Sequence, residues 1–478
     1  MPQAKPRLGL RSRVHGIMLC ASVPHRRQRS QTLMKCRQAS SPARRISANE
    51  AAALVTSNSW LDYGACLNQP TAFDRALARR VGEVENVKIR STLSLRPRAV
   101  IEADPDGRSF HMFSWHFSGL DRRYHNAGRC HYSPLNLGEV PDYYRRFLDP
   151  IDITVLQVCP PDVEGRYNFG PTLLWYRALI ESSRCVIVEV SPHLPPVKGG
   201  DCFIHASEID YWIEGDNEAL AQLPNPPPSD ACRRVAQLIL GELEDGSCLQ
   251  IGIGGMPNAV CSLLADSSIQ NLSIHTEMMT DGLAALYQAG KITGMHKRID
   301  VGLNVYTFAL GSTSLYQTLE GNDAFSIRRV DYTNAPEIIQ MNDRVVSINN
   351  TTQIDLQGQI ASESHGHRHI SGTGGQLQFV RGAYASRGGK AFVCLTSTYE
   401  RHGERRSRIT LDLTAGNIVT TPRSDAMYIV TEYGMVNLKG KSVPERARAL
   451  IGLAHPDYRE GLERQAYERR LLARGVWF

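Results

Sequence analysis

Twelve residues carry the strongest signal in this chain: Asn271-Leu-Ser-Ile-His-Thr-Glu-Met-Met-Thr-Asp-Gly282. Leu272 and Ile274 alternate with polar residues, as in a strand, and a single carboxylate, Glu277, follows where this strand ends. A helix is expected from Asp281, which places an acidic side chain in its first turn. Ligands of open α/β sheets bind where the strands end. The segment therefore predicts an α/β fold with Glu277 in the binding crevice.

The same alternation of strands and helices extends over most of the chain. Such alternation favours parallel sheets whose two faces are covered by helices. We predict two doubly wound, Rossmann-like α/β domains, residues 46–224 and 229–478, separated by the proline run Asn225-Pro-Pro-Pro-Ser-Asp230. The predicted strands are 59–64, 87–91, 153–158, 185–190, 249–253, 299–303 and 392–395. The predicted helices are 47–54, 73–80, 172–183, 231–243, 259–265, 281–289 and 336–341.

Composition excludes several classes of protein. The 478 residues are 42% hydrophobic and 21% charged, which is typical of a globular protein. The net charge of +6 comes from residues 1–49, which contain eleven Lys or Arg and no acidic residue, so we do not expect nucleic-acid binding. No apolar run reaches the roughly 18 residues that span a bilayer, so a soluble protein is expected. The eleven cysteines form no CxxC pair and are expected to be reduced thiols.

Residues 1–45 are basic, rich in Ser and interrupted by prolines. This composition resembles a mitochondrial transit peptide. A disordered leader, or sequence upstream of the true start, is the alternative. The expected location is therefore cytoplasmic, or the mitochondrial matrix if the extension is a transit peptide.

A first glycine-rich segment, Leu249-Gln-Ile-Gly-Ile-Gly-Gly-Met-Pro-Asn258, follows a predicted strand and precedes a predicted helix. Gly252, Gly254 and Gly255 allow a ligand to approach the backbone, and a helix N-terminus favours phosphate. The spacing differs from the GxGxxG of a dinucleotide fold, so a nicotinamide dehydrogenase ranks last among our hypotheses. A tight strand-to-helix turn without a ligand is the plain structural alternative.

A second glycine-rich segment is Ser371-Gly-Thr-Gly-Gly-Gln-Leu-Gln-Phe379. Its backbone N–H groups could point inward, as the stabilisation of an oxyanion requires. A flexible hairpin would have a similar composition and is the alternative here. The chain contains neither a GxSxG nucleophile elbow nor a GxxxxGK[ST] phosphate loop.

Glu277 itself allows two interpretations. It could be a salt-bridged carboxylate at a strand end, or a nucleophile toward an activated acyl group. A carboxylate attacks a thioester poorly unless the substrate is held in a reactive pose, which can contribute roughly 7–11 kcal/mol. Binding energy from a large, unreactive part of the substrate could supply that orientation.

Three histidines lie close together in Glu363-Ser-His-Gly-His-Arg-His369. If this segment is extended, His365, His367 and His369 share one face. A zinc site would add a fourth ligand or a water. We favour imidazoles that line a polar pocket or are exposed, and we predict no metal site.

In this order the motifs resemble those of the acetyl-CoA hydrolase/transferase family of class I CoA-transferases, from about Ile46 to the C-terminal region. The motifs that carry the resemblance are Gly252-Ile-Gly-Gly-Met-Pro257, Ile274-His-Thr-Glu277, Val330-Asp-Tyr-Thr-Asn-Ala-Pro336, Ser371-Gly-Thr-Gly-Gly-Gln376, Val430-Thr-Glu-Tyr-Gly434, Lys439-Gly-Lys-Ser442 and Ala454-His-Pro-Asp457. Trp60-Leu-Asp-Tyr-Gly64, Phe113-Ser-Trp-His-Phe-Ser-Gly119 and Gly165-Arg-Tyr-Asn-Phe-Gly170 are similar to the branch that handles 4-hydroxybutyrate, butyrate and itaconate.

The resemblance implies a ping-pong CoA-transferase in which Glu277 forms an acyl-glutamyl anhydride and then a glutamyl-CoA thioester. It implies that CoA and acyl-CoA are substrates, with no permanently bound cofactor. Gly375 would supply an oxyanion-hole amide, and Asn334 a second donor. The CoA-binding positions would be Gly254, Gly255, Met256, Pro257, Asn258, Gly374 and Gly375.

The resemblance leaves the donor and acceptor acids open. A hydrolase that uses the same glutamate and a non-catalytic acyl-CoA-binding protein are the alternatives. The segment from His365 to His369 departs from relatives, so Arg368 or a histidine could hold the second carboxylate of a dicarboxylic acyl group. We expect a homo-oligomer with small-molecule substrates.

Overall fold

The computed structural model describes residues 43–224 and 227–473. A parallel sheet of eight strands dominates the first half of this range, in the order β1-β10-β8-β6-β2-β3-β4-β5. Every neighbouring pair in it is parallel. The strands are β1 (Arg44–Arg45), β2 (Trp60–Ala65), β3 (Val87–Thr92), β4 (Phe110–Ser114), β5 (Cys130–Tyr132), β6 (Ile151–Val158), β8 (Ser183–Val190) and β10 (Tyr211–Glu214).

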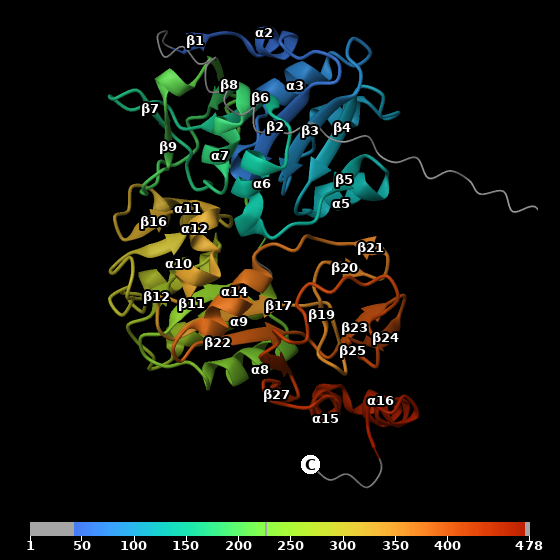
Figure 1. The fold of residues 1–478 in the computed structure, drawn as a ribbon. Coiled ribbons are helices and arrows are strands. Elements are labelled where there is room, and N and C mark those ends of the chain that lie inside the picture. Colours follow the sequence, from blue (N-terminus) through green and yellow to red (C-terminus); the bar gives the residue numbers. More distant parts are fainter. Residues whose placement is uncertain (1–42, 225–226, 474–478) are drawn as a thin grey trace, which may run out of the picture. The chain divides into compact units, whose positions relative to one another are not determined.

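The order of this sheet reverses between β2 and β6. From β2 the chain adds β3, β4 and β5 on one side, and β6, β8 and β10 then extend the other side (Figure 1). This is the topological switch point at which doubly wound sheets bind ligands. The helices of this half are α2 (Ala48–Ala53), α3 (Ala72–Ala78), α4 (Ala99–Ala103), α5 (Gly119–Asn126), α6 (Val140–Arg146) and α7 (Tyr176–Glu181).

A second, six-stranded sheet lies in the later half, in the order β12-β11-β17-β22-β26-β27. It is parallel except for the last pair. The chain adds β12 on one side of β11 and β17 on the other, so a second switch point lies at β11. The strands are β11 (Cys248–Ile251), β12 (Ser273–Ile274), β17 (Val345–Asn350), β22 (Lys390–Cys394), β26 (Tyr428–Thr431) and β27 (Gly434–Asn437).

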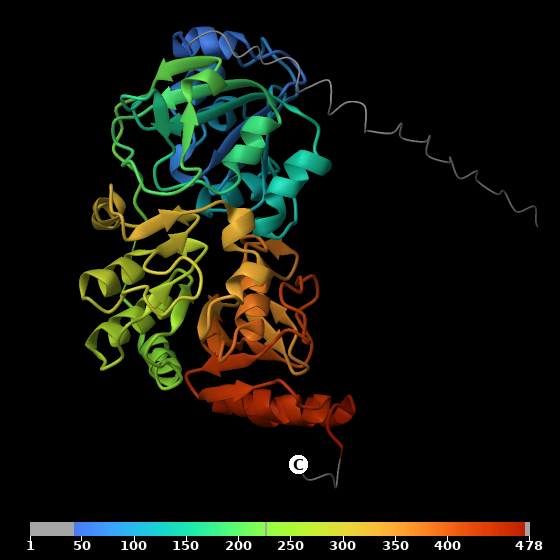
Figure 2. The same cartoon turned by 60° about the vertical axis from the view of Figure 1, so that its left-hand side comes forward.

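The helices of the later half pack on this sheet and on one another. Helices α8 and α9 are in contact, as are α9 and α10, and Figure 2 shows α15 and α16 side by side in red. The helices are α8 (Asp230–Leu240), α9 (Gly255–Asp266), α10 (Asp281–Gln288), α11 (Thr313–Leu319), α12 (Val330–Thr333), α13 (Pro336–Ile339), α14 (Gln376–Ala385), α15 (Val443–Leu453) and α16 (Pro456–Glu468).

The other short strands form separate small sheets of two or three strands. They are grouped as β13 (Met278–Met279) with β15 (Phe308–Ala309), β14 (Asn304–Tyr306) with β16 (Phe325–Ile327), and β7 (Arg166–Asn168) with β9 (Phe203–His205). Further groups are β18 (Gln353–Asp355) with β19 (Ile360–Ala361) and β25 (Ile409–Thr410), β20 (Ser364–His365) with β21 (Arg368–His369), and β23 (Thr398–Arg401) with β24 (Glu404–Ser407).

The predicted α/β class with parallel sheets is confirmed, and local signals hold in detail. Helix α2 begins with the expected capping box, in which the Ser47 hydroxyl accepts from Glu50 N–H and Glu50 reaches back. The domain boundaries stay a prediction, and residues 225–226 of the proline run lie outside the described residues, as do residues 1–42 of the extension. Arg44 and Arg45, which we had assigned to that extension, form the edge strand β1.

Two predicted elements are wrong, and both errors come from left-handed backbone. Residues 299–303 form turns rather than a strand, because Asp300 (φ 50°) and Gly302 (φ 77°) cannot lie in an extended chain. The strand begins only at Asn304. The helix expected over 172–183 starts only at Tyr176, because Leu174 has φ 46°.

The largest apolar core of the described range contains residues of both sheets, and each half also has a smaller core of its own. Leu156 and Val158 of β6 belong to it, and so do Leu249 and Ile251 of β11. The two sheets are therefore packed through a common interior. Within the described range, every helix is too short or too polar to cross a membrane.

Candidate active site

Glu277 lies at a bend where the chain leaves the second sheet. It stands between β12, which pairs with β11, and β13, which pairs with β15. Its carbonyl oxygen accepts from the N–H groups of Thr307 (3.1 Å) and Phe308 (3.2 Å), which fixes the backbone at the bend. The side chain is thereby presented at the carboxyl end of the strand, as the sequence predicted.

Asn334 and Gly375 meet the Glu277 carboxylate. Asn334 Nδ2 donates to Glu277 Oε2 at 2.5 Å, and the Gly375 N–H donates to the same carboxylate. A Cβ at Gly375 would lie 2.1 Å from Glu277 Oε2 and 2.4 Å from Asn334 Nδ2. Only glycine therefore fits at position 375. The structure thus brings together the three residues that the sequence named as catalytic candidates.

The environment of Glu277 raises its pKa. Burial is the main cause and raises the value to about 7, while the hydrogen bonds from Asn334 and Gly375 act in the opposite direction. The side chain nevertheless keeps a solvent-accessible edge. The carboxylate can therefore be reached by a substrate while it is only weakly stabilised as an anion.

The backbone next to Asn334 is held by a buried histidine. His275 Nε2 lies 2.9 Å from the carbonyl oxygen of Thr333, so it carries the hydrogen of this contact. Burial lowers the pKa of His275 to about 4, so the imidazole is neutral at pH 7. Asn334 is fully buried, and its Oδ1 has no hydrogen-bond partner among the residues that the structure describes.

The glycine-rich segment 371–375 is not a flexible hairpin, the alternative that its composition allowed. It leads into α14, and Gly375 is the N-cap. The first half of the chain contacts it closely: Phe117 N–H donates to Ser371 O (3.1 Å), and Leu137 N–H donates to Gly374 O (3.0 Å).

The other glycine-rich segment forms the strand-to-helix turn between β11 and α9. Gly254 is the N-cap of α9 with φ 116°, a conformation that favours glycine. Asn350 Nδ2, at the end of β17, donates to Ile253 O (3.1 Å). Further along α9, Asn258 Oδ1 lies 3.8 Å from where a Cβ at Gly282 would be. Residues 254–258 thus lie at the second switch point, near the start of α10, while Met256 and Pro257 are buried in the core-facing side of the helix.

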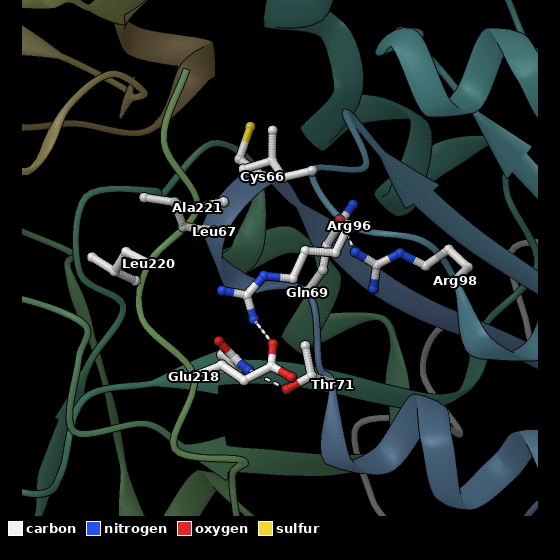
Figure 3. Close-up of a pocket in the computed structure, with 11 residues that line it drawn as sticks. Cys66, Leu67, Gln69, Thr71, Arg96, Arg98, Glu218, Leu220 and Ala221 are labelled. Carbon is white, nitrogen blue, oxygen red and sulfur yellow. Dashed lines mark hydrogen bonds and ion pairs between the residues drawn. The ribbon is translucent and has the colours of Figure 1, made fainter. Parts of the chain in front are cut away.

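A pocket opens at the switch point of the first sheet. Cys66 follows β2, Gln157 lies in β6, and the segment from Leu95 follows β3; these residues line one small cavity of about 20 Å³. Arg96 pairs with Glu218 across this pocket, and Arg98 Nη2 donates to Gln69 Oε1 at 2.5 Å (Figure 3). Burial raises the pKa of the Cys66 thiol, and the charges of Asp121 and Glu277 add to this effect. Cys66 is therefore within electrostatic reach of Glu277.

The histidine segment is a hairpin rather than one extended strand. Strands β20 and β21 pair antiparallel through a turn at Gly366 (φ 60°), so the three imidazoles do not share one face. His367 and Arg368 are exposed, whereas His369 packs against Tyr132 with ring centroids 3.7 Å apart. No cluster of three or more His, Cys, Asp or Glu suited to a metal occurs among the described residues.

Sequence reasoning missed the contributions of the first half of the chain. His116 borders the glycine loop: a Cβ at Gly374 would lie 3.4 Å from His116 Cε1 and 4.0 Å from Glu277 Oε1. Burial lowers the pKa of His116 to about 4. Cys66 (φ 53°) and Leu93 (φ 55°) have left-handed backbones at the ends of β2 and β3. Their position at the ends of predicted strands was the feature of the sequence that could have indicated a place near the site.

Comparison with known proteins agrees with this geometry. The N-terminal domain of the acetyl-CoA hydrolase/transferase family matches residues 29–224, and its C-terminal domain matches residues 311–466. The butyryl-CoA:acetate CoA-transferase of Anaerostipes caccae is 44% identical over 430 residues, which cover 89% of this chain and 96% of that protein.

Two further relatives extend the likeness to a second activity and to a solved structure. The 4-hydroxybutyrate coenzyme A transferase of Clostridium kluyveri is 36% identical, with 89% of this chain and 97% of that protein covered. The crystal structure of RipA from Yersinia pestis matches with a TM-score of 0.82 and 36% identity, over 90% of this chain and 98% of that one. The family models, the relatives and the fold agree: this chain is an enzyme of the acetyl-CoA hydrolase/transferase family, and a CoA-transferase.

Proposed function

We propose that this enzyme exchanges CoA between a short-chain acyl-CoA and a small carboxylate through Glu277. The observation that carries the proposal is the Glu277 carboxylate held between the Asn334 amide and the Gly375 N–H. Two donors on one carboxyl group suit a glutamyl carbonyl that is itself attacked, because its oxygen then becomes an oxyanion.

The first half-reaction has two steps. A Glu277 oxygen attacks the thioester carbonyl, the C–S bond breaks, and an acyl-glutamyl anhydride and CoA thiolate form. The thiolate then attacks the glutamyl carbonyl, which releases the acyl group as a carboxylate and leaves a glutamyl-CoA thioester. An acceptor carboxylate reverses both steps and leaves as the new acyl-CoA. One thioester replaces another, so neither ATP nor a metal is required.

CoA would bind along residues 254–258 and 374–375. The N-terminus of the twelve-residue helix α9 offers backbone N–H groups to a phosphate. Gly254 and Gly255 leave room for a ligand, since a Cβ at either would meet no atom closer than 3.5 Å. Binding of the part of CoA that does not react would supply the orientation that a weak carboxylate nucleophile needs.

The acyl group would extend from Glu277 toward Cys66, which also lines the pocket at the first switch point. Arg96 in this pocket is already paired with Glu218, and it also donates to Ala219 O. These partners favour an uncharged acyl tail of butyryl or 4-hydroxybutyryl type over a dicarboxylic one. Arg368, the residue we considered for a second carboxylate, is exposed on its hairpin.

The test is mass spectrometry of the enzyme after incubation with butyryl-CoA, with and without acetate. We expect CoA attached to the peptide that contains Glu277, and no adduct in Glu277→Ala. Acetate should convert butyryl-CoA into acetyl-CoA. Equal CoA release with and without acetate would favour the hydrolase alternative, and binding without adduct or turnover would favour the non-catalytic one.

A further inference from the structure

The segment 370–374, which leads to Gly375, is held by hydrogen bonds from both halves of the chain, including several from the first half. Phe117 N–H donates to Ser371 O, and Leu137 N–H donates to Gly374 O. Arg122 Nη1 donates to Ile370 O at 2.8 Å. The place of the Gly375 N–H relative to Glu277 therefore depends on elements of the first sheet.

A buried carboxylate, Glu363, joins this segment to β5. Glu363 is 3% exposed; its Oε2 accepts from the Tyr132 hydroxyl (3.0 Å) and from Thr373 Oγ1 (3.2 Å). Thr420 Oγ1 donates to the other oxygen at 2.9 Å. The Tyr132 oxygen in turn accepts from Thr373 N–H at 3.2 Å. The Tyr132 hydroxyl is thus both donor and acceptor between β5 and the glycine loop.

His369 adds a second link between the same partners. Its ring lies on the Tyr132 ring and meets Phe117 edge-on, with centroids 5.2 Å apart. His369 Nε2 lies 2.8 Å from Ser371 O, and since a carbonyl only accepts, this nitrogen carries a hydrogen. Burial lowers the pKa of His369, so the neutral ring makes this contact at pH 7.

The structure assigns Tyr132 and His369 as positioning residues of the thioester exchange. They hold segment 370–374 so that the Gly375 N–H donates to the Glu277 carboxylate. Both act through the loop rather than on the reacting atoms. The assignment rests on the proposed function, in which this N–H stabilises the glutamyl oxyanion. A displacement of about 1 Å in such a group can cost about 100-fold in rate.

The test compares Tyr132→Phe and His369→Ala with the native enzyme in butyryl-CoA:acetate exchange. We expect kcat to fall by about 10- to 100-fold while KM for butyryl-CoA stays within about twofold. The acid limb of kcat/KM should also move to higher pH, because the Gly375 N–H lowers the pKa of Glu277. This limb reports Glu277: the neighbouring His116 has a pKa of about 4, and the pKa of the Cys66 thiol is raised.

His367→Ala is the matched control, because His367 is exposed on the same hairpin. It should keep native kcat, KM and pH profile. Thermal melts will show whether each variant is folded, and Tyr132→Phe removes a single oxygen. Native kcat and an unmoved acid limb in folded Tyr132→Phe would overturn the assignment, as would a rise in KM alone or an equal loss in His367→Ala. If Glu277→Ala kept native turnover, the proposed function itself would fail instead.

Discussion

The two glycine-rich loops look alike in the sequence and differ in the structure. Both precede a helix, with Gly254 as the N-cap of α9 and Gly375 as the N-cap of α14. A Cβ at Gly254 or Gly255 would make only ordinary van der Waals contacts, at 3.5 Å or more, and Ile253 next to them is 47% exposed. Gly375 is enclosed by Glu277 and Asn334. The first loop is therefore accessible from outside, and the second is fixed on the Glu277 carboxylate.

This difference shows that glycine has two uses within one site. At Gly254 and Gly255 the missing side chain would leave room for the CoA that we propose to bind there. At Gly375 it leaves room for a carboxylate that is already present. Four measurements would test this contrast.

Gly375→Ala should have the largest effect. The new Cβ would lie 2.1 Å from Glu277 Oε2, so either the amide or the carboxylate must move. We expect kcat to fall by about 1,000-fold, the upper end for loss of one oxyanion donor. The measurement is steady-state exchange between butyryl-CoA and acetate, with circular dichroism to establish folding. Activity within tenfold of native would contradict the close contact.

Asn334→Ala should follow, with a loss of about 100-fold in kcat. It removes the 2.5 Å hydrogen bond to Glu277 and leaves the Gly375 N–H in place. Because that hydrogen bond lowers the pKa of Glu277, the acid limb of the pH profile should also rise. A pH titration of kcat/KM checks both points, and an unchanged limb would argue against Asn334 as a donor to the carboxylate.

The native enzyme should respond to pH through one group. Glu277 must be ionised to attack, and its pKa is about 7. The ionised fraction, and with it kcat/KM, should therefore be about tenfold lower at pH 6 than at pH 8. Initial rates at limiting acyl-CoA measure this directly. A flat profile between these values would mean that burial perturbs Glu277 less than its surroundings indicate.

Gly255→Ala should have the smallest effect and is the matched counterpart of Gly375→Ala. Its Cβ would meet nothing closer than Pro228 Cα at 3.6 Å, so the fold can accept it. If CoA passes close to this backbone, KM for acyl-CoA should rise several-fold, by roughly 1 kcal/mol of binding, while kcat stays near native. A native KM would place CoA elsewhere.

The sequence predicted the parts of the site that depend on local pattern. Glu277 at a strand end and the glycine loop before α14 were found from local pattern, whereas Asn334 was named only from the resemblance to the family; the structure brings the three together. The parallel sheets followed from the alternation of strands and helices. The capping box at Ser47 was equally local.

What the sequence could not give are contacts between distant segments. Tyr132 and Glu363 are separated by 231 residues, and Tyr132 and Thr373 by 241. No periodicity relates such positions, so the support of the glycine loop was invisible. The two wrong element predictions have another cause. Asp300 and Leu174 take left-handed conformations that cannot be predicted from their residue types.

The apolar interior common to both sheets has a consequence for how the enzyme unfolds on heating. Side chains of β6 and β11 belong to the same core, so neither half can melt and leave the other with a complete interior. Calorimetry should record a single endotherm rather than two. Glu277 and its two hydrogen-bond donors, Asn334 and Gly375, would then lose their native arrangement at the same temperature.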